Sequence, residues 1–547
     1  MTLDVAHSQK TVAPNQPKGR AAVFQRLKAL TLDPLKPRAS VLASFDGRLT
    51  YVGDDFHEAL ETLPEQMEAE VVDFKDRYVL PGLIDSHAHI AQEGLRLSQL
   101  DLRGLSREQI VEAVEKEAQG KKPGEWIHGR AWDQNGWPGG WPTNLDLDKA
   151  APQNPVVLDR IDKHTIWVNS KALEAAGLTA ELKPIKGGEV IRGVDGSLSG
   201  IFIGQAMNLI YSAMSPNDGL DYVESFIRAE ALTLKYGLTT LIDLAFKPSE
   251  LPRIVEALQG GRIKSRLRLY YIAFPCPDDL NLCPRADLWG SKLAIDGIKV
   301  FSDGSLGSRS AWLNEDYTDR PYHRGAHAHS DESLEEIFIK ARDLGYQVAI
   351  HVIGDAAVSQ AVRTIEKVLG SEKTDRRWRL EHYQLADPND HEKVLNMGLV
   401  VSIQSVGLMT DISMAVERLG QERIKRAYAW REVIDRGGLL INGSDCPVES
   451  ANPFLGIYAA VSRKDLKGQP KGGFFPAQAL TRLEALSSYT VWAAMAAFQE
   501  KNLGSLEEGK FCDFTVIDRD LLTCPERAIA STRVLATVVG GEAVWVG

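Results

Sequence analysis

The chain has 547 residues, of which 44% are hydrophobic, and this is enough apolar material for a large core and more than one domain. Its formal net charge is -11 and no Lys/Arg-rich face stands out, so the composition argues against a nucleic-acid or anionic-membrane partner. The five cysteines are too few and too scattered for a disulfide framework, and no run approaches about 18 apolar residues. We therefore expect a cytoplasmic protein without a membrane span.

The two ends of the chain are rich in short strands. Residues 1–19 have no apolar segment of signal-peptide length and are predicted to form a flexible tail. Residues 20–80 contain a hairpin signal at Asp46-Gly47, and residues 504–547 contain another at Gly540-Gly541. We expect both ends to combine into one small β-sandwich domain.

The middle of the chain, residues 81–503, alternates strand-like apolar runs with helical patterns such as residues 356–369. This alternation is typical of a parallel α/β array. Eight such runs with intervening helices predict a (β/α)8 TIM-like barrel, and hence an α/β fold class. The runs are one ending at His89, then 238–244, 267–274, 297–304, 347–355, 378–382, 399–404 and 438–445.

The gap between the first and second barrel strands is too long for a single crossover, so we place an insertion at about residues 100–220. The insertion is rich in tryptophan. Most of these indoles should form its own core, whereas a minority would roof the barrel mouth and contact substrate, with Trp132 as the expected contact. The tryptophans are Trp126, Trp132, Trp137, Trp141 and Trp167.

Polar residues recur where the predicted barrel strands end, which is where barrel enzymes keep their chemistry. His87 and His89 are two apart, so on a strand their imidazoles point the same way and form half of a site for a divalent metal. Packing requirements alone do not explain why four histidines and a lysine would gather at the same end of the barrel. The ring consists of His87, His89, Lys299, His351, His382 and Asp445.

Other histidines are expected to be unrelated to this ring. His327-Ala-His329, with His323 nearby, follows no apolar strand and lies in a polar loop, so we do not expect a metal there. His391 is predicted at the surface, and His128 is predicted to be structural.

Several motifs together resemble the amidohydrolase superfamily, and within it the YtcJ-like or amidohydrolase-3 group. The resemblance covers nearly the whole chain, and its combination of motifs is specific although no single motif is. Lys163 departs from the group, in which we expect glycine. The motifs are Leu80-Pro-Gly-Leu-Ile-Asp-Ser-His-Ala-His, Ile298-Lys-Val-Phe-Ser-Asp-Gly-Ser-Leu-Gly-Ser-Arg, His351-Val-Ile-Gly-Asp, Leu380-Glu-His and Gly443-Ser-Asp-Cys-Pro-Val.

The resemblance implies a divalent metal cofactor, zinc in the first place, with cobalt or manganese as alternatives. His87, His89 and Asp445 would hold one ion, and His351 and His382 would hold a second. Lys299 would be carboxylated and bridge them, because a neutral amine captures CO2 and the resulting carbamate offers two hard oxygen ligands. The alternative is an uncarboxylated Lys299 beside a single ion.

The resemblance also implies a metal-dependent amidohydrolase, cleaving a C–N bond in an amide, N-formyl compound, carbamate or cyclic amide. A metal-activated hydroxide would attack the carbonyl, with Asp445 as general base and then general acid. His164 or Arg309 would bind substrate or stabilise the oxyanion. The alternatives are a structural role for His164 and an ion pair of Arg309 with Asp303 or Asp355.

Two further functions stay open. A deaminase of the same superfamily is one, but those enzymes carry a glutamate where this chain has Gly354, and they lack the bridging lysine. A non-catalytic regulatory protein that keeps the fold is the other, although every expected ligand is present. The expected partner is a small-molecule substrate, and a homodimer is the commonest assembly for such a protein.

Overall fold

A computed structural model describes residues 19–547, apart from residues 66, 135–136, 138–139, 162–163, 184, 186–187, 215–220, 273–284 and 289–290. Most of the predicted tail, together with Lys163, Cys276 and Cys283, lies outside the described residues. The chain divides into two compact units. One is formed by the chain up to Ala88, Thr233–Phe246 and Lys264–Gly547, and the other by His89–Leu232 and Lys247–Ile263.

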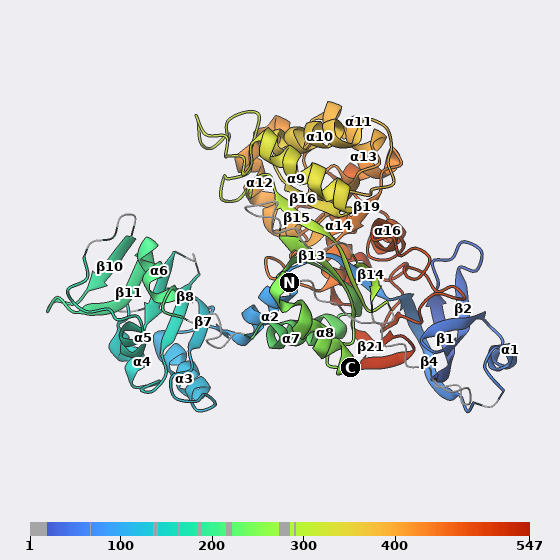
Figure 1. Cartoon of the computed structure of the whole chain (residues 1–547), viewed down its shortest axis with the longest axis horizontal. Helices are drawn as coiled ribbons and strands as arrows, with labels where there is room; N and C mark the ends of the chain where they lie inside the picture. Colours follow the sequence, from blue (N-terminus) through green and yellow to red (C-terminus); the bar gives the residue numbers. More distant parts are fainter. Residues whose placement is uncertain are drawn as a thin grey trace. The chain divides into compact units, whose positions relative to one another are not determined.

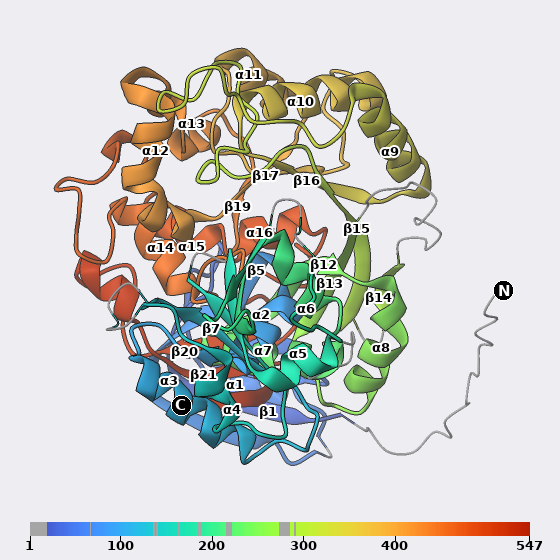
Figure 2. The same cartoon turned by 90° about the vertical axis from the view of Figure 1, so that its left-hand side faces the viewer.

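The first unit contains the predicted barrel. Eight strands lie in chain order around one sheet, and every neighbouring pair is parallel. Every predicted strand is present, so the α/β barrel fold is confirmed (Figure 2). The strands are β5 (Leu83–Ala88), β12 (Leu238–Phe246), β13 (Arg266–Ile272), β15 (Leu293–Phe301), β16 (Gln347–Val352), β17 (Arg379–His382), β18 (Val400–Ile403) and β19 (Leu440–Asn442).

The ring closes between β19 and β5 through the residues that follow β19, instead of through a strand ladder. The backbone N–H of Asp445 donates to the carbonyl of His87 at 2.7 Å. The buried Asp85 carboxylate accepts from the Ser444 N–H at 2.9 Å and from its hydroxyl at 2.6 Å. Burial raises the pKa of Asp85 to about 6, while the bonds from Ser444 oppose that rise. The closing seam therefore joins the two chain segments that carry His87 and Asp445.

Helices cover the outside of the sheet after most strands (Figure 2). The predicted helix at 356–369 is α10. The helix α9 has Ser330 as its N-cap and Gly345 as its C-cap, and the φ of 79° at Gly345 favours glycine. One connection differs from the prediction, because the described residues between β13 and β15 form the antiparallel strand β14 (Arg285–Leu288). The helices are α9 (Asp331–Leu344), α10 (Asp355–Leu369), α11 (Pro388–Asn396), α12 (Leu408–Arg423), α13 (Trp430–Asp435), α14 (Pro453–Ser462), α15 (Arg482–Ser487) and α16 (Val491–Ala496).

Both ends of the chain meet in a seven-stranded sheet of the first unit, where blue strands lie beside red ones in Figure 1. Its order is β22-β21-β20-β4-β1-β2-β3, so strands from both termini share one sheet, which fits the predicted small β region. Both predicted two-residue turns are present, and Asp46, Gly47, Gly540 and Gly541 all have positive φ. The elements are β1 (Ala21–Leu30), β2 (Arg38–Phe45), β3 (Arg48–Gly53), α1 (Phe56–Glu61), β4 (Glu70–Pro81), β20 (Phe514–Ile517), β21 (Val534–Val539) and β22 (Glu542–Val546).

The second unit has its own six-stranded sheet, in the order β10-β11-β9-β8-β7-β6, with two separate hydrophobic cores. No helix in the described part of the chain combines the length and the apolar character that crossing a bilayer requires. Its elements are α2 (Ile90–Ser98), β6 (Leu100–Asp101), α3 (Arg107–Ala118), β7 (Ile127–Trp132), α4 (Asn144–Asp148), β8 (Val156–Arg160), β9 (Thr165–Val168), α5 (Ser170–Ala175), β10 (Gly188–Arg192), β11 (Leu198–Gly204), α6 (Asn208–Tyr211), most of α7 (Tyr222–Lys235) and α8 (Leu251–Gln259).

Candidate metal centre

Three predicted ligands from distant parts of the chain converge inside the barrel. One ligand atom from each of His87, His382 and Asp445 lies within 4.8 Å of the others. His87 is fully buried, and its Nε2 is 3.3 Å from Oδ1 of Asp445. Imidazole nitrogens and a carboxylate oxygen at this spacing form a donor set that suits a divalent metal.

Local backbone geometry aims two of these side chains. Side chains alternate across a strand, so Glu381 and His382 would normally face opposite sides of the sheet. His382 has a φ of 72° and Asp445 a φ of 58°, a left-handed backbone that non-glycine residues adopt at a cost in energy. This departure lets His382 join the interior cluster directly after Glu381, and its ring centroid is 5.0 Å from that of His87.

His351 and Lys299 lie beside the same cluster. The His351 ring centroid is 4.3 Å from that of His382, and its Nε2 is 3.3 Å from the Gly304 carbonyl. Burial lowers the pKa of His351 to about 3, with the nearby Lys299 adding to the effect, and burial also lowers the pKa of His382. Neutral imidazoles of this kind are the form that binds metal.

Lys299 is fully buried, and its Nζ has no hydrogen-bond partner among the described residues. Burial lowers the pKa of its ammonium to about 8, although the carboxylates of Glu381 and Asp445 oppose the shift. A buried amine without a bond is unusual, because such groups are nearly always paired. The residues present therefore fit a metal site, with a nitrogen available for the predicted carboxylation.

Glu381 is a site residue that the sequence interpretation quoted in a motif without giving it a role. Its fully buried carboxylate is 2.6 Å from His87 Nδ1 and 2.7 Å from Arg379 Nε. Burial raises the pKa of Glu381, but the charge of Arg379, and then that of His87, outweighs this and holds the pKa below its usual range. The available signal was the pattern Arg379-Leu-Glu381, which puts two opposite charges on one face of a strand.

Three predicted site residues belong to the second unit. His89 follows the end of β5 and is the N-cap residue of α2, so it is no longer part of the strand as predicted. His164 is exposed and immediately precedes β9. Trp132 is fully buried, donates its indole N–H to the Leu158 carbonyl at 2.7 Å and packs against other tryptophans, so we leave it out of the proposed substrate contacts.

Arg309 has a different ion-pair partner from the two considered from the sequence. It pairs with Asp319 at 2.7 Å instead of with Asp303 or Asp355, because its loop folds back on itself. Asp303 instead accepts from the backbone N–H groups of Gly354 at 2.8 Å, Trp312 at 3.0 Å and Ile353 at 3.1 Å. Asp303 thereby fixes the loop after β15 beside His351.

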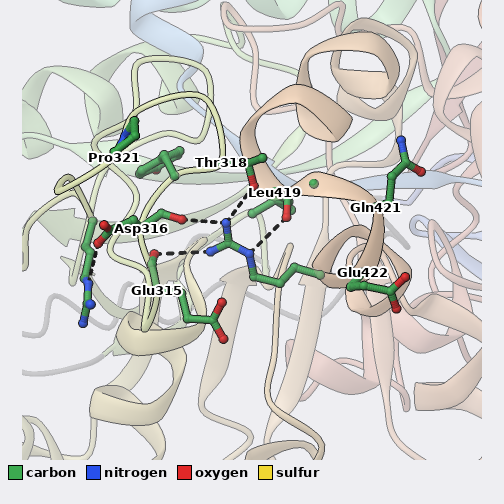
Figure 3. Close-up of a pocket in the computed structure, with 11 residues that line it drawn as sticks. Glu315, Asp316, Thr318, Pro321, Leu419, Gln421 and Glu422 are labelled. Carbon is green, nitrogen blue, oxygen red and sulfur yellow. Dashed lines mark hydrogen bonds and ion pairs between the residues drawn. The ribbon is translucent and has the colours of Figure 1, made fainter.

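A surface pocket of about 580 Å³ lies where the loop after β15 meets α12 (Figure 3), and no predicted site residue lines it. Arg423 is one of the residues that line it, and its guanidinium donates to the carbonyls of Asp316 at 2.6 Å, Leu419 at 3.0 Å and Glu315 at 3.2 Å, and to the Thr318 hydroxyl at 3.0 Å. Because these donors bond the Leu419 carbonyl of α12 as well as three atoms of the loop, Arg423 ties the loop after β15 to α12.

The histidines outside the ring behave as structural groups, with one correction. His327 Nδ1 contacts the His329 carbonyl at 2.8 Å, and His323 Nε2 contacts the Arg309 carbonyl at 2.7 Å. His391 was expected at the surface but is only 5% exposed, because it packs under Tyr383 and bonds its hydroxyl at 3.1 Å. Its position on the inner face of α11 explains the burial.

The comparisons with known proteins agree with this geometry. A family model described as "Amidohydrolase family" matches residues 70–545. The chain is 31% identical over 502 residues to YtcJ of Bacillus subtilis (strain 168), whose name assigns it provisionally to the amidohydrolases, with 90% of this chain and 94% of YtcJ covered. It is 27% identical over 539 residues to the N-substituted formamide deformylase of Arthrobacter pascens, with 93% and 96% covered.

A solved structure is similar over nearly the whole chain. The crystal structure of an uncharacterized metal-dependent hydrolase from Pyrococcus furiosus superposes with a TM-score of 0.77 at 30% identity, covering 92% of this chain and all of the other. At this identity the likeness extends beyond the fold to a related sequence.

Proposed function

This chain is a hydrolase of the amidohydrolase family, and on that premise we propose that it cleaves a C–N bond in a small amide, N-formyl compound, carbamate or cyclic amide. The observation that carries the proposal is the buried cluster of His87, His382 and Asp445, whose ligand atoms lie within 4.8 Å of one another. Structural packing gives no reason to gather two imidazoles and a carboxylate in one interior.

The proposed centre uses residues from several strand ends. His87, His382 and Asp445 would hold a divalent cation, and the resemblance adds His89 and His351 as further ligands. Zinc suits nitrogen-rich sites of this kind, and cobalt or manganese are alternatives. When bound, the cation supplies an acidified water molecule and polarises the carbonyl of the substrate.

Asp445 is the proposed proton carrier. Its side chain is 13% exposed, whereas that of His87 is fully buried and His382 is 9% exposed, so Asp445 is the most accessible member of the cluster. It would take the proton of the attacking water and return it to the leaving amine. The Asp445 N–H bond to the His87 carbonyl at 2.7 Å fixes the backbone from which it acts.

Lys299 is the proposed bridge between two cations. Its deeply buried Nζ lies near carboxylates, where an ammonium would compete with metal for the same space. A pKa of about 8 leaves part of the amine neutral at neutral pH, and a neutral amine forms a carbamate with CO2. The carbamate would supply two oxygen ligands and negative charge.

An N-formyl amine is the first substrate class to test. The Arthrobacter pascens relative is named for hydrolysing N-substituted formamides, and the similarity covers 93% of this chain. Amides, carbamates and cyclic amides are the remaining candidates, since one barrel fold hosts many hydrolyses.

A deaminase is disfavoured by a local packing constraint. Such an enzyme would need a glutamate at position 354, but a Cβ added to Gly354 would lie 2.0 Å from the Trp312 carbonyl oxygen. The backbone could not accept a larger residue there without a shift of the loop after β15.

The test combines metal analysis with a substrate panel. Purified protein should contain zinc or another divalent metal and release amine from at least one N-formyl amine, amide, carbamate or cyclic amide. Exhaustive chelation should abolish that activity, and zinc, cobalt or manganese should restore it. Turnover that survives complete chelation would contradict the proposal, and a protein with neither metal nor turnover would favour a regulatory role.

A further inference from the structure

Glu381 occupies an unusual position between a cation and a proposed metal ligand. Its Oε1 accepts from Arg379 Nε at 2.7 Å, and its Oε2 is 2.6 Å from His87 Nδ1. Arg379 is 1% exposed and also donates to the Ser86 carbonyl, one residue before His87. The three side chains form a buried chain that reaches from β17 to β5, two strands that are not neighbours in the sheet.

The chemistry of these contacts fixes where the proton of a neutral His87 lies. An ionised carboxylate only accepts hydrogen bonds, so the proton of the imidazole must be on Nδ1. The Gln404 amide is 3.1 Å from the same nitrogen, and a half-turn of that amide would let its oxygen share the proton. The lone pair of a neutral His87 is then on Nε2.

That lone pair faces Asp445 Oδ1 at 3.3 Å. Two acceptors so close repel each other unless a proton or a cation lies between them. The geometry therefore orients His87 for binding a cation through Nε2, and this orientation depends on the partner at Nδ1.

We propose that Glu381 is a positioning residue that fixes the tautomer and the ring orientation of His87, and that Arg379 holds the Glu381 carboxylate in place. The inference rests on the proposed function, because it assumes that His87 binds a metal. Glu381 would then contribute to the metal affinity of the centre without contacting the metal, and the ligand atom of His87 would be Nε2.

A purely structural ion pair is the competing explanation, and the same unit offers a matched control. Arg266 and Asp513 form a bidentate pair at 2.7 and 3.0 Å with side chains 4% and 3% exposed, nearly as buried as the Arg379–Glu381 pair at 1% and 0%. Asp513 also accepts from the Gly540 N–H at 2.7 Å, so its remaining bond goes to backbone instead of to a histidine. Asp513→Asn therefore weakens a buried pair without touching His87.

The experiment measures metal binding to the full chain. Wild type, Glu381→Gln, Glu381→Ala and Asp513→Asn are stripped of metal, and the Kd for zinc is measured by competition with a chromophoric chelator. Visible spectra of the cobalt-loaded proteins report the coordination of the centre. Thermal unfolding of the stripped proteins reports any general loss of stability.

We expect Glu381→Ala to weaken zinc binding by about 10- to 100-fold and to change the cobalt spectrum. Glu381→Gln keeps an oxygen that accepts the Nδ1 proton, so it should lose less affinity than the alanine variant. Asp513→Asn should unfold at lower temperature but keep the wild-type zinc Kd and cobalt spectrum.

Two results would overturn the inference in distinguishable ways. If wild type binds zinc and both Glu381 variants bind it equally well, Glu381 is only structural and the proposed function stands. If wild type binds no divalent metal, both the inference and the proposed metal centre fail. If Glu381→Ala does not fold, the comparison of Glu381→Gln with Asp513→Asn decides between the same outcomes.

Discussion

Two buried Arg–carboxylate pairs of the first unit differ in the other group to which each carboxylate bonds. At the proposed centre, Glu381 is shared between Arg379 and His87. Near the sheet formed by both termini, Asp513 is shared between Arg266 and the Gly540 backbone, and Arg266 also stacks on Phe511 at 3.5 Å from the ring centroid. Burial and charge are nearly the same in both pairs.

The difference shows that a buried ion pair is not by itself a sign of function. Breaking either pair leaves an uncompensated charge and should destabilise the fold. Only the Glu381 carboxylate contacts an imidazole that belongs to the cluster of potential metal ligands. A substitution should therefore alter metal binding and turnover only at the Glu381 pair. The two cases differ in the second partner of the carboxylate, which is a histidine for Glu381 and a backbone N–H for Asp513.

The largest effect on activity is expected from replacing Lys299, whose amine lies near the Glu381 carboxylate. Lys299→Ala removes the proposed bridge, so the variant should lose metal as well as turnover, with partial rescue by small carboxylates such as acetate. Metal content and activity are measured together, with and without the added acid. A variant that keeps the wild-type metal content would contradict the bridge.

The second-largest effect on activity is expected from replacing Asp445, the proposed proton carrier. Asp445→Asn keeps the side-chain shape but removes the base, so kcat should fall by about 10²- to 10⁴-fold. Thermal unfolding checks that the fold is retained. Near-normal turnover in a folded variant would exclude Asp445 as general base. It would also weaken the argument that the Glu381 pair, and not the Asp513 pair, lies beside catalytic groups.

The structural pair should show the opposite behaviour. Asp513→Asn should lower the free energy of unfolding by about 3–5 kcal/mol, because it leaves Arg266 buried without its partner charge. Its kcat and KM should match wild type wherever the variant is folded. Denaturant unfolding followed by tryptophan fluorescence, together with activity assays, checks both expectations. A specific loss of kcat would show that the two ends of the barrel are coupled.

A smaller, pH-dependent effect is expected from a third pair nearer the surface. Hydrogen bonds from Arg431 lower the pKa of Glu484 to about 2, and both side chains are 21% exposed. A depressed carboxyl pKa stabilises the fold above the unfolded value near 4.5, and this stability is lost as the pH falls from there through 2. After a discount for exposure, it amounts to about 2 kcal/mol at pH 7.

The measurement compares the melting temperatures of wild type and Glu484→Gln from pH 7 down to pH 3. Wild type should be more stable at pH 7, and the gap should begin to close below about pH 4.5. A gap that stays constant over this range would show that the charge of Glu484 makes no contribution to stability.

Much of the fold could be predicted from residue patterns. The eight barrel strands were readable because each is a short apolar run followed by polar residues, and the two terminal hairpins because Asp46-Gly47 and Gly540-Gly541 suit turns with positive φ. The strand β14 was missed, since four residues carry too little periodicity. His391 was misjudged because a helix position does not reveal which neighbour covers it.

The candidate site was only partly predictable. His87, Lys299, His351, His382 and Asp445 were chosen for their positions at strand ends, and the barrel brings them into one interior. Glu381 was missed because its role depends on a distance across the barrel to His87, 294 residues away in sequence. The partner of Arg309 was missed for a local reason, because the folding of its own loop decides which acid it meets.

The sequence by itself determined the order of the strands, the residue types at their ends and the family to which the chain belongs, because these follow from local periodicity and motifs. Only the tertiary structure decided which charges are compensated, which imidazole nitrogen lies beside a carboxylate and which tryptophan is buried. Those properties depend on Coulomb and hydrogen-bond interactions that act over a few ångströms, between residues that closure of the barrel brings together.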